Sequence, residues 1–194
     1  MSQYSEQLTN ELNVNLGEIL ASKYILFDTC VVSRLSNSKT KSPTTEIFDF
    51  LNDIKCIPGI SEQIYVEYLR DHQNSQSFEK AREFLSKFPR KTLSSNRIPN
   101  FDERMIIIDR INQNYGYRAK QISYVDLTIA VFLHYWPDNL FLATFNIKDF
   151  CHKIFDVIYV MPVIFGNNLE LLGIIKANRE NLTAENKKLI NIKS

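Results

Sequence analysis

Two short apolar runs that end abruptly in polar residues constrain the fold of this chain most strongly. The run at 24–27 is followed by Asp28 and Thr29, and the run at 140–143 is followed by Thr144. Apolar runs of this length are typical of strands buried on both faces of a parallel sheet. The carboxyl ends of such strands open onto the ligand crevice of an α/β domain, so Asp28 is expected to have a role in binding or catalysis rather than in core packing.

Strand-like and helix-like stretches alternate along the chain, which favours an α/β fold with a small parallel sheet of four or five strands, covered on both faces. Strands are expected at 24–27, at the short and ambiguous 55–60, at 140–144 and at about 155–163. Helices are expected at 29–35, 45–54, from about 61, and at 77–88, 102–115, 124–135 and 169–176. An amphipathic helix before the first strand is indicated by apolar residues at helical spacing, namely Leu8, Leu12, Leu16, Ile19 and Leu20.

Length and composition fit one domain with terminal extensions, since 194 residues with 44% hydrophobic content are ample for a single core. Lys and Arg total 23 against 22 acids, so the net charge of +1 gives no overall signature of nucleic-acid binding. Any such contact must come from local basic patches, although a solvated helix face or loop explains each patch more simply. The patches are Lys80 with Arg82, Lys87 with Arg90 and Lys91, and Arg118 with Lys120.

The cysteines and the termini exclude several other classes of protein. Cys30, Cys56 and Cys151 are too few and too scattered for a disulfide framework, and with the three histidines they form no zinc-like spacing. A reducing, cytoplasmic location is therefore the default expectation. No secretion signal opens the chain and no run of about 18 apolar residues occurs, so a soluble protein without membrane contact is expected.

Four acids and one carboxamide are the candidates for chemistry, and each also has a structural explanation. These residues are Asp28, Glu67, Asp126, Asn146 and Asp149. Asp28 can cap the helix that begins at Thr29, because Asp is a favoured N-cap residue. Glu67 can be an ordinary surface acid that pairs with Arg70 at i+3.

The later candidates leave similar alternatives open. Asp126 begins an otherwise apolar helix, where burying a carboxylate is costly. Ser123 and Asp126 nevertheless also resemble a capping box. In the segment 144–150, a turn followed by a helix cap explains Thr144 and Asn146 as well as a functional role does.

Taken in order, the motifs around Asp28, Glu67, Asp126 and Asn146 resemble the four motifs of the PIN-domain nucleases over roughly residues 23–160. The resemblance implies a three-layer α/β/α PIN-like fold with the acids at the carboxyl edge of the sheet. It divides the chain into an N-terminal helical extension at 1–22, a PIN-like nuclease domain at 23–165, and a C-terminal helix with a polar tail at 166–194. In other members the position of Asn146 is often Asp, so either Asn146 or Asp149 completes the site.

For this family the implied activity is that of a divalent-metal-dependent endoribonuclease that hydrolyses RNA. Asp28, Glu67 and Asp126 are implied as ligands of Mg²⁺ or Mn²⁺, which prefer such hard oxygen donors. If these acids converge, their repulsion also calls for a cation. The residues implied to position water, metal or phosphate are Thr29, Thr144 and Asn146, with Asp149 as a further acid acting through water.

The resemblance also implies partners. The small stand-alone members of the family look like VapC-type toxins of toxin–antitoxin pairs, so an antitoxin protein, a homodimer and an RNA substrate are implied. A housekeeping nuclease remains an open alternative, because VapC-type toxins are usually shorter than this chain. The alternative is a catalytically inert PIN-like module that binds RNA or a protein, which Asn146 in place of an acid favours. Aromatic rings near the motifs can stack on bases. They are Tyr65, Tyr68, Tyr115, Tyr117 and Tyr124.

Overall fold

The computed structural model describes residues 16–37, 42–72, 74–88, 100–116 and 122–181. These residues form a mixed α/β fold around a five-stranded sheet with the strand order β2-β1-β3-β5-β4. The strands are β1 (Tyr24–Phe27), β2 (Ile57–Gly59), β3 (Leu140–Thr144), β4 (Phe155–Phe165) and β5 (Asn168–Ala177). The α/β class and all four expected strands are confirmed, including the ambiguous stretch after residue 55.

The sheet is only partly parallel. β2, β1 and β3 run parallel, whereas β5 is antiparallel to both β3 and β4. The prediction of a helix at 169–176 is therefore wrong, and the sheet continues past residue 165. The stretch is so apolar that it fits either periodicity, and pairing with a strand on each side satisfies its backbone. Gly166, with φ of 63°, and Asn167 form the two-residue turn that joins β4 to β5.

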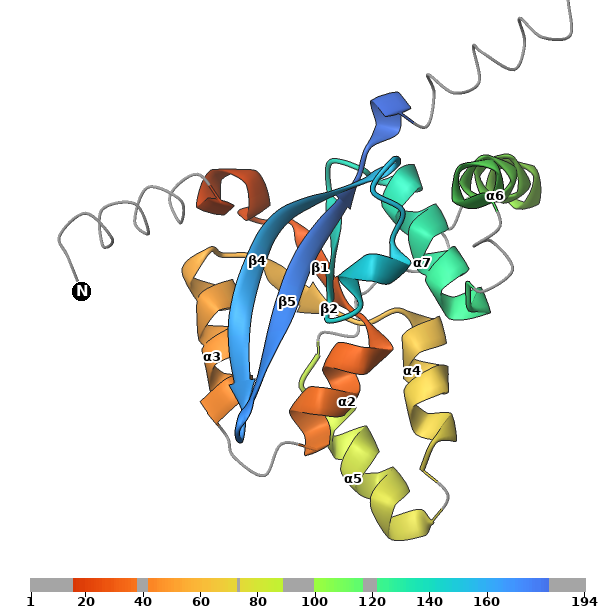
Figure 1. Ribbon diagram of the computed structural model, residues 1–194. Coiled ribbons are helices and arrows are strands. Elements are labelled where there is room, and N and C mark those ends of the chain that lie inside the picture. Colours follow the sequence, from red (N-terminus) through yellow and green to blue (C-terminus); the bar gives the residue numbers. More distant parts are fainter. Residues whose placement is uncertain (1–15, 38–41, 73, 89–99, 117–121, 182–194) are drawn as a thin grey trace, which may run out of the picture.

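Helices cover both faces of the sheet (Figure 1). They are α2 (Thr29–Asn37), α3 (Ser42–Asp53), α4 (Glu62–Arg70), α5 (Ser75–Leu85), α6 (Phe101–Tyr115), α7 (Tyr124–Tyr135) and the short 3-10 helix η3 (Ile147–Asp149). Phe50 of α3 stacks on Tyr159 of β4 with ring centroids 5.1 Å apart, and His134 of α7 contacts Phe155 at 4.8 Å. Phe155 and Tyr159 point to opposite faces because a bulge after Val157 shifts the alternation, so α3 and α7 lie on opposite faces.

The core follows the apolar runs of the sequence. Every residue of β3 is buried, as are the last three of β1. The predicted buried helix is confirmed, since the residues from Ile129 to His134 in α7 are all buried. No helix within the described ranges is both long and apolar enough to cross a membrane.

Some predictions fall outside the described residues. Residues 16–20 are helical, with Leu16 and Leu20 buried and Ile19 exposed, which agrees with the end of the expected N-terminal helix. The rest of that helix, at 1–15, lies outside the described residues. So do four of the basic side chains, Tyr117 and the polar tail from residue 182. The basic residues are Arg90, Lys91, Arg118 and Lys120.

Candidate functional site

The candidate site lies where β1 and β3 end side by side. Phe27 pairs with Ala143 in parallel register, and the backbone N–H of Asp28 donates to the carbonyl of Ala143 at 3.0 Å. The next residues along the two strands are Asp28 and Thr144, which are 5% and 0% exposed. Parallel pairing therefore brings the first predicted acid against a predicted hydroxyl at the carboxyl edge of the sheet.

Hydrogen bonds reach both carboxylate oxygens of Asp28. Oδ1 accepts from the N–H of Thr29 at 2.7 Å. Oδ2 accepts from the hydroxyl of Thr144 at 2.6 Å and from the thiol of Cys30 at 3.1 Å. Capping of α2 thus accounts for one oxygen only, because Oδ2 is held by a side chain of β3 rather than by the helix backbone.

Thr144 and Cys30 orient Asp28 from the interior. The Thr144 oxygen also accepts from the backbone N–H of Asn146 at 2.9 Å. Because Thr144 is fully buried, it acts on the site through Asp28 and the following loop rather than by touching a substrate. Burial raises the pKa of the Cys30 thiol to about 12, with the charge of Asp28 as a further cause. Cys30 therefore stays protonated and donates its thiol hydrogen to Asp28.

Glu67 joins the site from α4. The hydroxyl of Thr29, the first residue of α2, donates a hydrogen bond to Oε2 of Glu67, and Glu67 is half-buried. Among the described residues, Glu67 forms no ion pair with Arg70, which lies 3.9 Å from Asp71 instead. Thr29 therefore links the helix after β1 to the helix after β2, and turns Glu67 toward the end of β1.

Asp126 lies in the capped first turn of its helix and is also affected by the charges of the other acids. Its N–H donates to the Ser123 hydroxyl oxygen at 3.0 Å, and that hydroxyl donates to Oδ2 of Asp126 at 2.7 Å, so Ser123 does cap α7. Burial raises the pKa of Asp126; the bond from Ser123 opposes this, and the charges of Asp28, Asp149 and Glu67 raise the pKa further. Ser123 thus caps α7 at Asp126, and the charges of three other acids act on the same carboxyl group.

Asp149 and Asn146 relate to the site in different ways. Both side chains are exposed in the loop after β3. Asn146 precedes η3 without a side-chain capping bond, and it contacts the site through its backbone N–H, which donates to Thr144. The charge of Asp149 acts on Asp126, so we group Asp28, Glu67, Asp126 and Asp149 as the acid cluster.

Two packing contacts hold the loop that carries Asp149. The Tyr115 hydroxyl of α6 donates to the carbonyl of Asp149 at 2.9 Å and accepts from the N–H of Cys151 at 3.0 Å. Ile147 lies directly over Gly173 of β5, where an added Cβ would come within 2.6 Å of Ile147 Cγ1 and 2.7 Å of Cδ1. Gly173 is paired with Thr144 in the sheet, so the absence of a side chain there allows η3 to sit against the end of β3.

The tyrosines expected near a substrate divide into two groups. Tyr115 and Tyr68 are 9% and 2% exposed, which leaves them unable to stack on a base, and Tyr115 instead supports the loop. Tyr65 and Tyr124 are 37% and 75% exposed. Among the described tyrosines of this set, Tyr65 and Tyr124 alone present ring surface to a ligand.

The donor chemistry of the acid cluster suits a hard cation. In the part of the chain that the structure describes, no three Asp, Glu, His or Cys side chains stand together as a ready metal-binding group. Even so, no acid of the cluster takes part in the ion pairs found between described residues. Each ionised carboxylate has about four lone-pair sites, so the hydroxyl bonds leave acceptor capacity. Hard oxygen donors of this kind fit Mg²⁺ or Mn²⁺ better than a softer metal.

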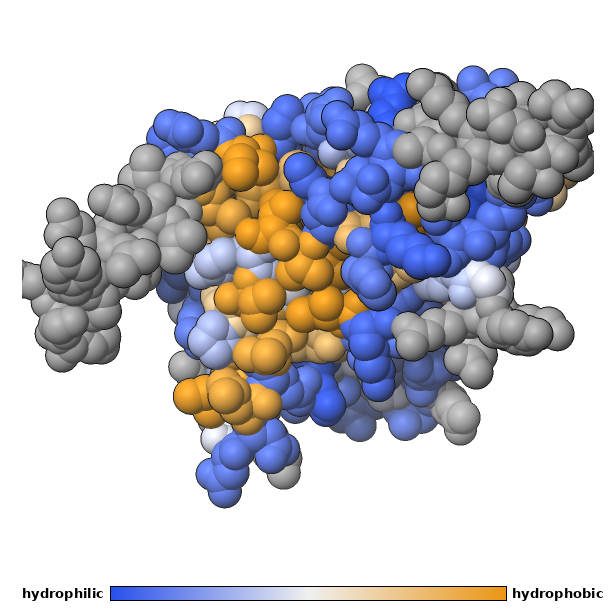
Figure 2. All heavy atoms as spheres, turned by 45° about the horizontal axis from the view of Figure 1, so that its top comes forward, coloured by the Kyte–Doolittle hydropathy of each residue, from blue (hydrophilic) through white to orange (hydrophobic). Residues whose placement is uncertain are grey.

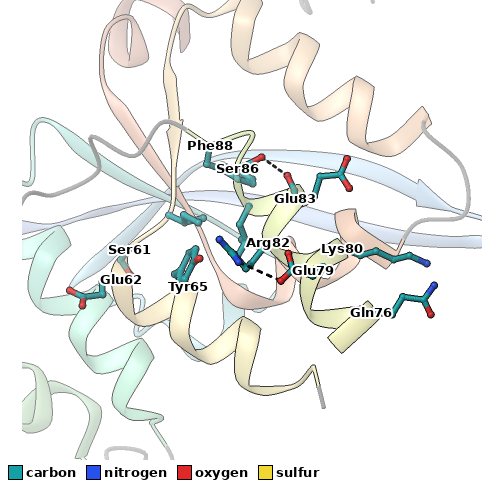
Figure 3. A pocket seen from close by; sticks show the side chains of 12 residues that line it. Ser61, Glu62, Tyr65, Gln76, Glu79, Lys80, Arg82, Glu83, Ser86 and Phe88 are labelled. Carbon is teal, nitrogen blue, oxygen red and sulfur yellow. Dashed lines mark hydrogen bonds and ion pairs between the residues drawn. The ribbon is translucent and has the colours of Figure 1, made fainter. Parts of the chain in front are cut away.

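A groove with a cavity volume of about 890 Å³ lies beyond the end of β2, between α4 and α5 (Figure 3). Its wall includes Tyr65 and the basic Lys80 and Arg82, but also three glutamates, and Arg82 lies 3.4 Å from one of them, Glu79. The acid cluster does not line this groove. The groove is therefore a neighbour of the site, with mixed charge.

Comparisons with models of protein families, with curated proteins and with solved structures found no match for this chain.

Proposed function

We propose that this protein is a divalent-metal-dependent endoribonuclease of the PIN-like type. The observation that supports the proposal is the pairing of β1 with β3, which puts Asp28 against Thr144 at the carboxyl edge of the sheet, with Glu67 bonded to the neighbouring Thr29. Burial raises the pKa of Asp126, and the charges of Asp28, Asp149 and Glu67 raise it further. Like charges gathered at partly buried positions oppose one another unless a cation neutralises them. The order of the motifs along the chain adds the resemblance to PIN-domain nucleases.

The roles follow from the contacts. Asp28, Glu67 and Asp126 would hold Mg²⁺ or Mn²⁺. When bound, the ion supplies an activated water and charge stabilisation for phosphodiester hydrolysis. Thr144 fixes the direction of Asp28, and Thr29 fixes that of Glu67. Asp149 is exposed, so its carboxylate can accept a proton from a solvent water.

RNA is proposed as the substrate from the resemblance and from the exposed rings. Single-stranded nucleic acids combine stacking on aromatic side chains with contacts to their phosphates. Tyr124 is two residues from Asp126 and is largely exposed. Tyr65 and Lys80 lie on the groove beyond β2. A VapC-like toxin role with an antitoxin partner, acting in the cytoplasm, is the form of this activity that the resemblance favours.

The second candidate is an inert PIN-like module that binds RNA or a protein. Asn146 in place of an acid favours it, as does the lack of a ready metal-binding group among the described side chains. The two candidates differ in one property that is simple to measure. A nuclease must bind the metal at the acid cluster, whereas an inert module need not.

The test is cleavage of a panel of single-stranded RNA and DNA in Mg²⁺ or Mn²⁺ by the wild type, Asp28→Asn and Asp126→Asn. Both variants are expected to lose at least about 100-fold in rate, since even groups that only support metal ligands contribute about 10- to 100-fold. The matched control is Asp138→Asn, because Asp138 is exposed in the turn before β3, at the opposite end of that strand.

Thermal unfolding gives a readout that does not depend on activity. Mn²⁺ at about 100 times its Kd stabilises a folded protein by about 2.7 kcal/mol, which raises the Tm by roughly 5–10 °C for a chain of this size. Asp126→Asn should reduce this rise and Asp138→Asn should not. Absence of both cleavage and any metal-dependent rise in the wild type would refute the nuclease and support the inert module.

A further inference from the structure

The groove between α4 and α5 has the size and the lining of a ligand site. Its cavity volume of about 890 Å³ lies within the range of about 300–1,000 Å³ that is usual for ligand clefts. Most side chains on its walls are polar and exposed, whereas three apolar side chains at its floor are buried, namely Ile60, Leu85 and Phe88. An apolar floor with a few polar groups around it is typical of a ligand-binding cleft.

Tyr65 and Arg82 face each other across this groove. Tyr65 comes from α4 and is 37% exposed, and Arg82 comes from α5 with 53% of its side chain exposed. In Figure 3 the Arg82 side chain points toward that of Tyr65. Glu79 holds Arg82 from the side, with 3.4 Å between Oε1 and Nη1, and this contact engages one arm of a guanidinium that has five N–H donors. A flat ring and a flat guanidinium thus stand on opposite walls, each with exposed surface.

We propose that the groove is a subsite for one unpaired base of the RNA substrate, which inserts between Tyr65 and Arg82. Unpaired bases stack on aromatic rings and on guanidinium planes. The inference rests on the proposed function, from which it takes RNA as the substrate. It adds a named subsite and a requirement for single-stranded RNA, because a base inside a duplex must first be unpaired and unstacked at a cost in free energy.

The charge of the groove favours a base over the phosphate backbone. Three glutamates line it against one lysine and one arginine, so its described lining has one more carboxylate than it has cations. A track for successive phosphates needs an excess of Lys and Arg instead. A base is uncharged, and its N–H groups and carbonyl oxygens pair with carboxylates and with a guanidinium. A free nucleotide suits the groove less well, because its phosphate monoester carries a charge of about −1.5 to −2 next to the base.

The groove lies close enough to the acid cluster for one strand of RNA to reach both. Gly59 of β2 pairs with Leu26 of β1, and two residues after this pair come Ser61 at the groove and Asp28 in the acid cluster. Neighbouring strands lie about 4.8 Å apart. α4 separates the two places, since it contacts both α5 and α7, and a helix with its side chains is about 10–12 Å across. An RNA strand that passes the N-terminal end of α4 therefore has a phosphate at the acid cluster and a nearby base in the groove.

The exposed apolar area over the β4–β5 hairpin has a different character. Figure 2 shows apolar side chains gathered there into one continuous area. Its exposed members are aliphatic, so they offer a base neither a flat ring nor a cation; they are Val157, Val160, Ile164, Leu169 and Leu171. The groove between α4 and α5 provides both.

The experiment is binding of a short labelled single-stranded RNA in EDTA, where metal-dependent cleavage does not occur. Fluorescence anisotropy gives the Kd for the full-length wild type and its variants. Tyr65→Ala and Arg82→Ala should each weaken binding about 5- to 150-fold, the usual effect of removing a group on which a base stacks. Tyr65→Phe keeps the ring and should stay within about 2-fold of the wild type. Arg82→Lys keeps the charge but loses the flat guanidinium, so it should weaken binding as Arg82→Ala does.

A strand of the same length that lacks all bases separates stacking from charge. The wild type should bind this abasic strand more weakly than the RNA, and Tyr65→Ala should bind it as the wild type does, because there is no base to lose. The same substitution should leave the affinity for duplex RNA unchanged, since the bases of a duplex are paired. Arg70→Ala is the matched control, because Arg70 is exposed on α4 and does not line the groove; it should leave RNA binding within about 2-fold of the wild type.

Three results would overturn the proposal: equal affinity of the wild type, Tyr65→Ala and Arg82→Ala for the RNA, an equal loss of affinity for the abasic strand, or tighter binding of adenosine monophosphate than of the RNA. The last result would assign the groove to a free nucleotide. A wild type that cleaves RNA but binds it independently of Tyr65 would refute the subsite alone. A wild type that binds RNA through Tyr65 but cleaves nothing would refute the nuclease alone. Far-UV circular dichroism and the Tm establish that the variants are folded, which is expected because both side chains are exposed.

Discussion

Mild acid is expected to destabilise this protein through His134. The side chain is 5% exposed, and neither ring nitrogen has a hydrogen-bond partner among the described residues. Its ring packs against Phe155 with centroids 4.8 Å apart. Protonation would place an uncompensated charge in the layer between α7 and the sheet, which is far more costly than keeping the neutral ring there.

The size of the effect follows from the pKa. Burial lowers the pKa of His134 from 6.5 to about 4. Since the folded state resists the proton that the unfolded chain binds, this stability is fully present above pH 6.5 and is lost as the pH falls toward 4. The interval between the two pKa values corresponds to roughly 3 kcal/mol in total. At about pH 5 roughly 2 kcal/mol of it is already lost.

The assay is urea unfolding at about pH 7.5 and about pH 5, for the wild type and His134→Leu. Leucine has no group to titrate and no nitrogen to leave unpaired. The free energy of unfolding that is lost between the two pH values should therefore be about 2 kcal/mol smaller in the variant than in the wild type. His152→Leu is the control, because His152 is exposed. Equal acid sensitivity of His134→Leu and the wild type would refute the reasoning, since the carboxylates would then account for all of it.

Two further predictions concern the loop that carries Asp149. Gly173→Ala should lower the free energy of unfolding by about 1–3 kcal/mol, the usual cost of overpacking, because the new Cβ would meet Ile147 at 2.6 Å. In a double-mutant cycle, adding Ile147→Ala should recover part of this loss. Simple additivity of the two substitutions would contradict the reasoning. Tyr115→Phe should lower the free energy of unfolding by about 1–3 kcal/mol, because it leaves the carbonyl of Asp149 and the N–H of Cys151 unpaired. It should also weaken Mn²⁺ binding about 10-fold or more in calorimetry. Tyr135→Phe is the control, since Tyr135 is at an exposed position and its substitution should have neither effect.

The sequence predicts best where burial is uniform. β1 and β3 are short apolar runs with the same environment on both faces, so composition alone indicates a central strand. For the same reason the apolar segment 124–135 is recognisable as a buried helix. Because parallel strands end at one edge, the meeting of Asp28 and Thr144 follows from the two runs and needs no further information.

β5 shows where local sequence fails. The apolar residues of β5 recur with no clear helical or strand period. Whether this segment becomes a helix or a strand therefore depends on its pairing with β3 and β4, which only the tertiary fold determines. A local signal was present in Gly166-Asn167, a two-residue turn between two apolar runs. The hydrogen bonds of Tyr115 and Cys30 could not be predicted for a related reason, since the partner of each side chain is fixed only by tertiary structure.

The base and the tip of the β4–β5 hairpin differ in their relation to the candidate site. Near its base, Gly173 pairs with Thr144 and accommodates Ile147, which supports the acid cluster. Leu169 lies four residues before Gly173 in β5, and at about 3.4 Å per residue in an antiparallel strand the separation is about 14 Å. Substitutions this far apart, with no shared partner, usually act additively. Leu169→Glu should therefore leave the Mn²⁺-dependent rise in Tm unchanged, whereas Gly173→Ala should reduce it; a loss of the rise in Leu169→Glu would mean that the site depends on the distal part of the hairpin.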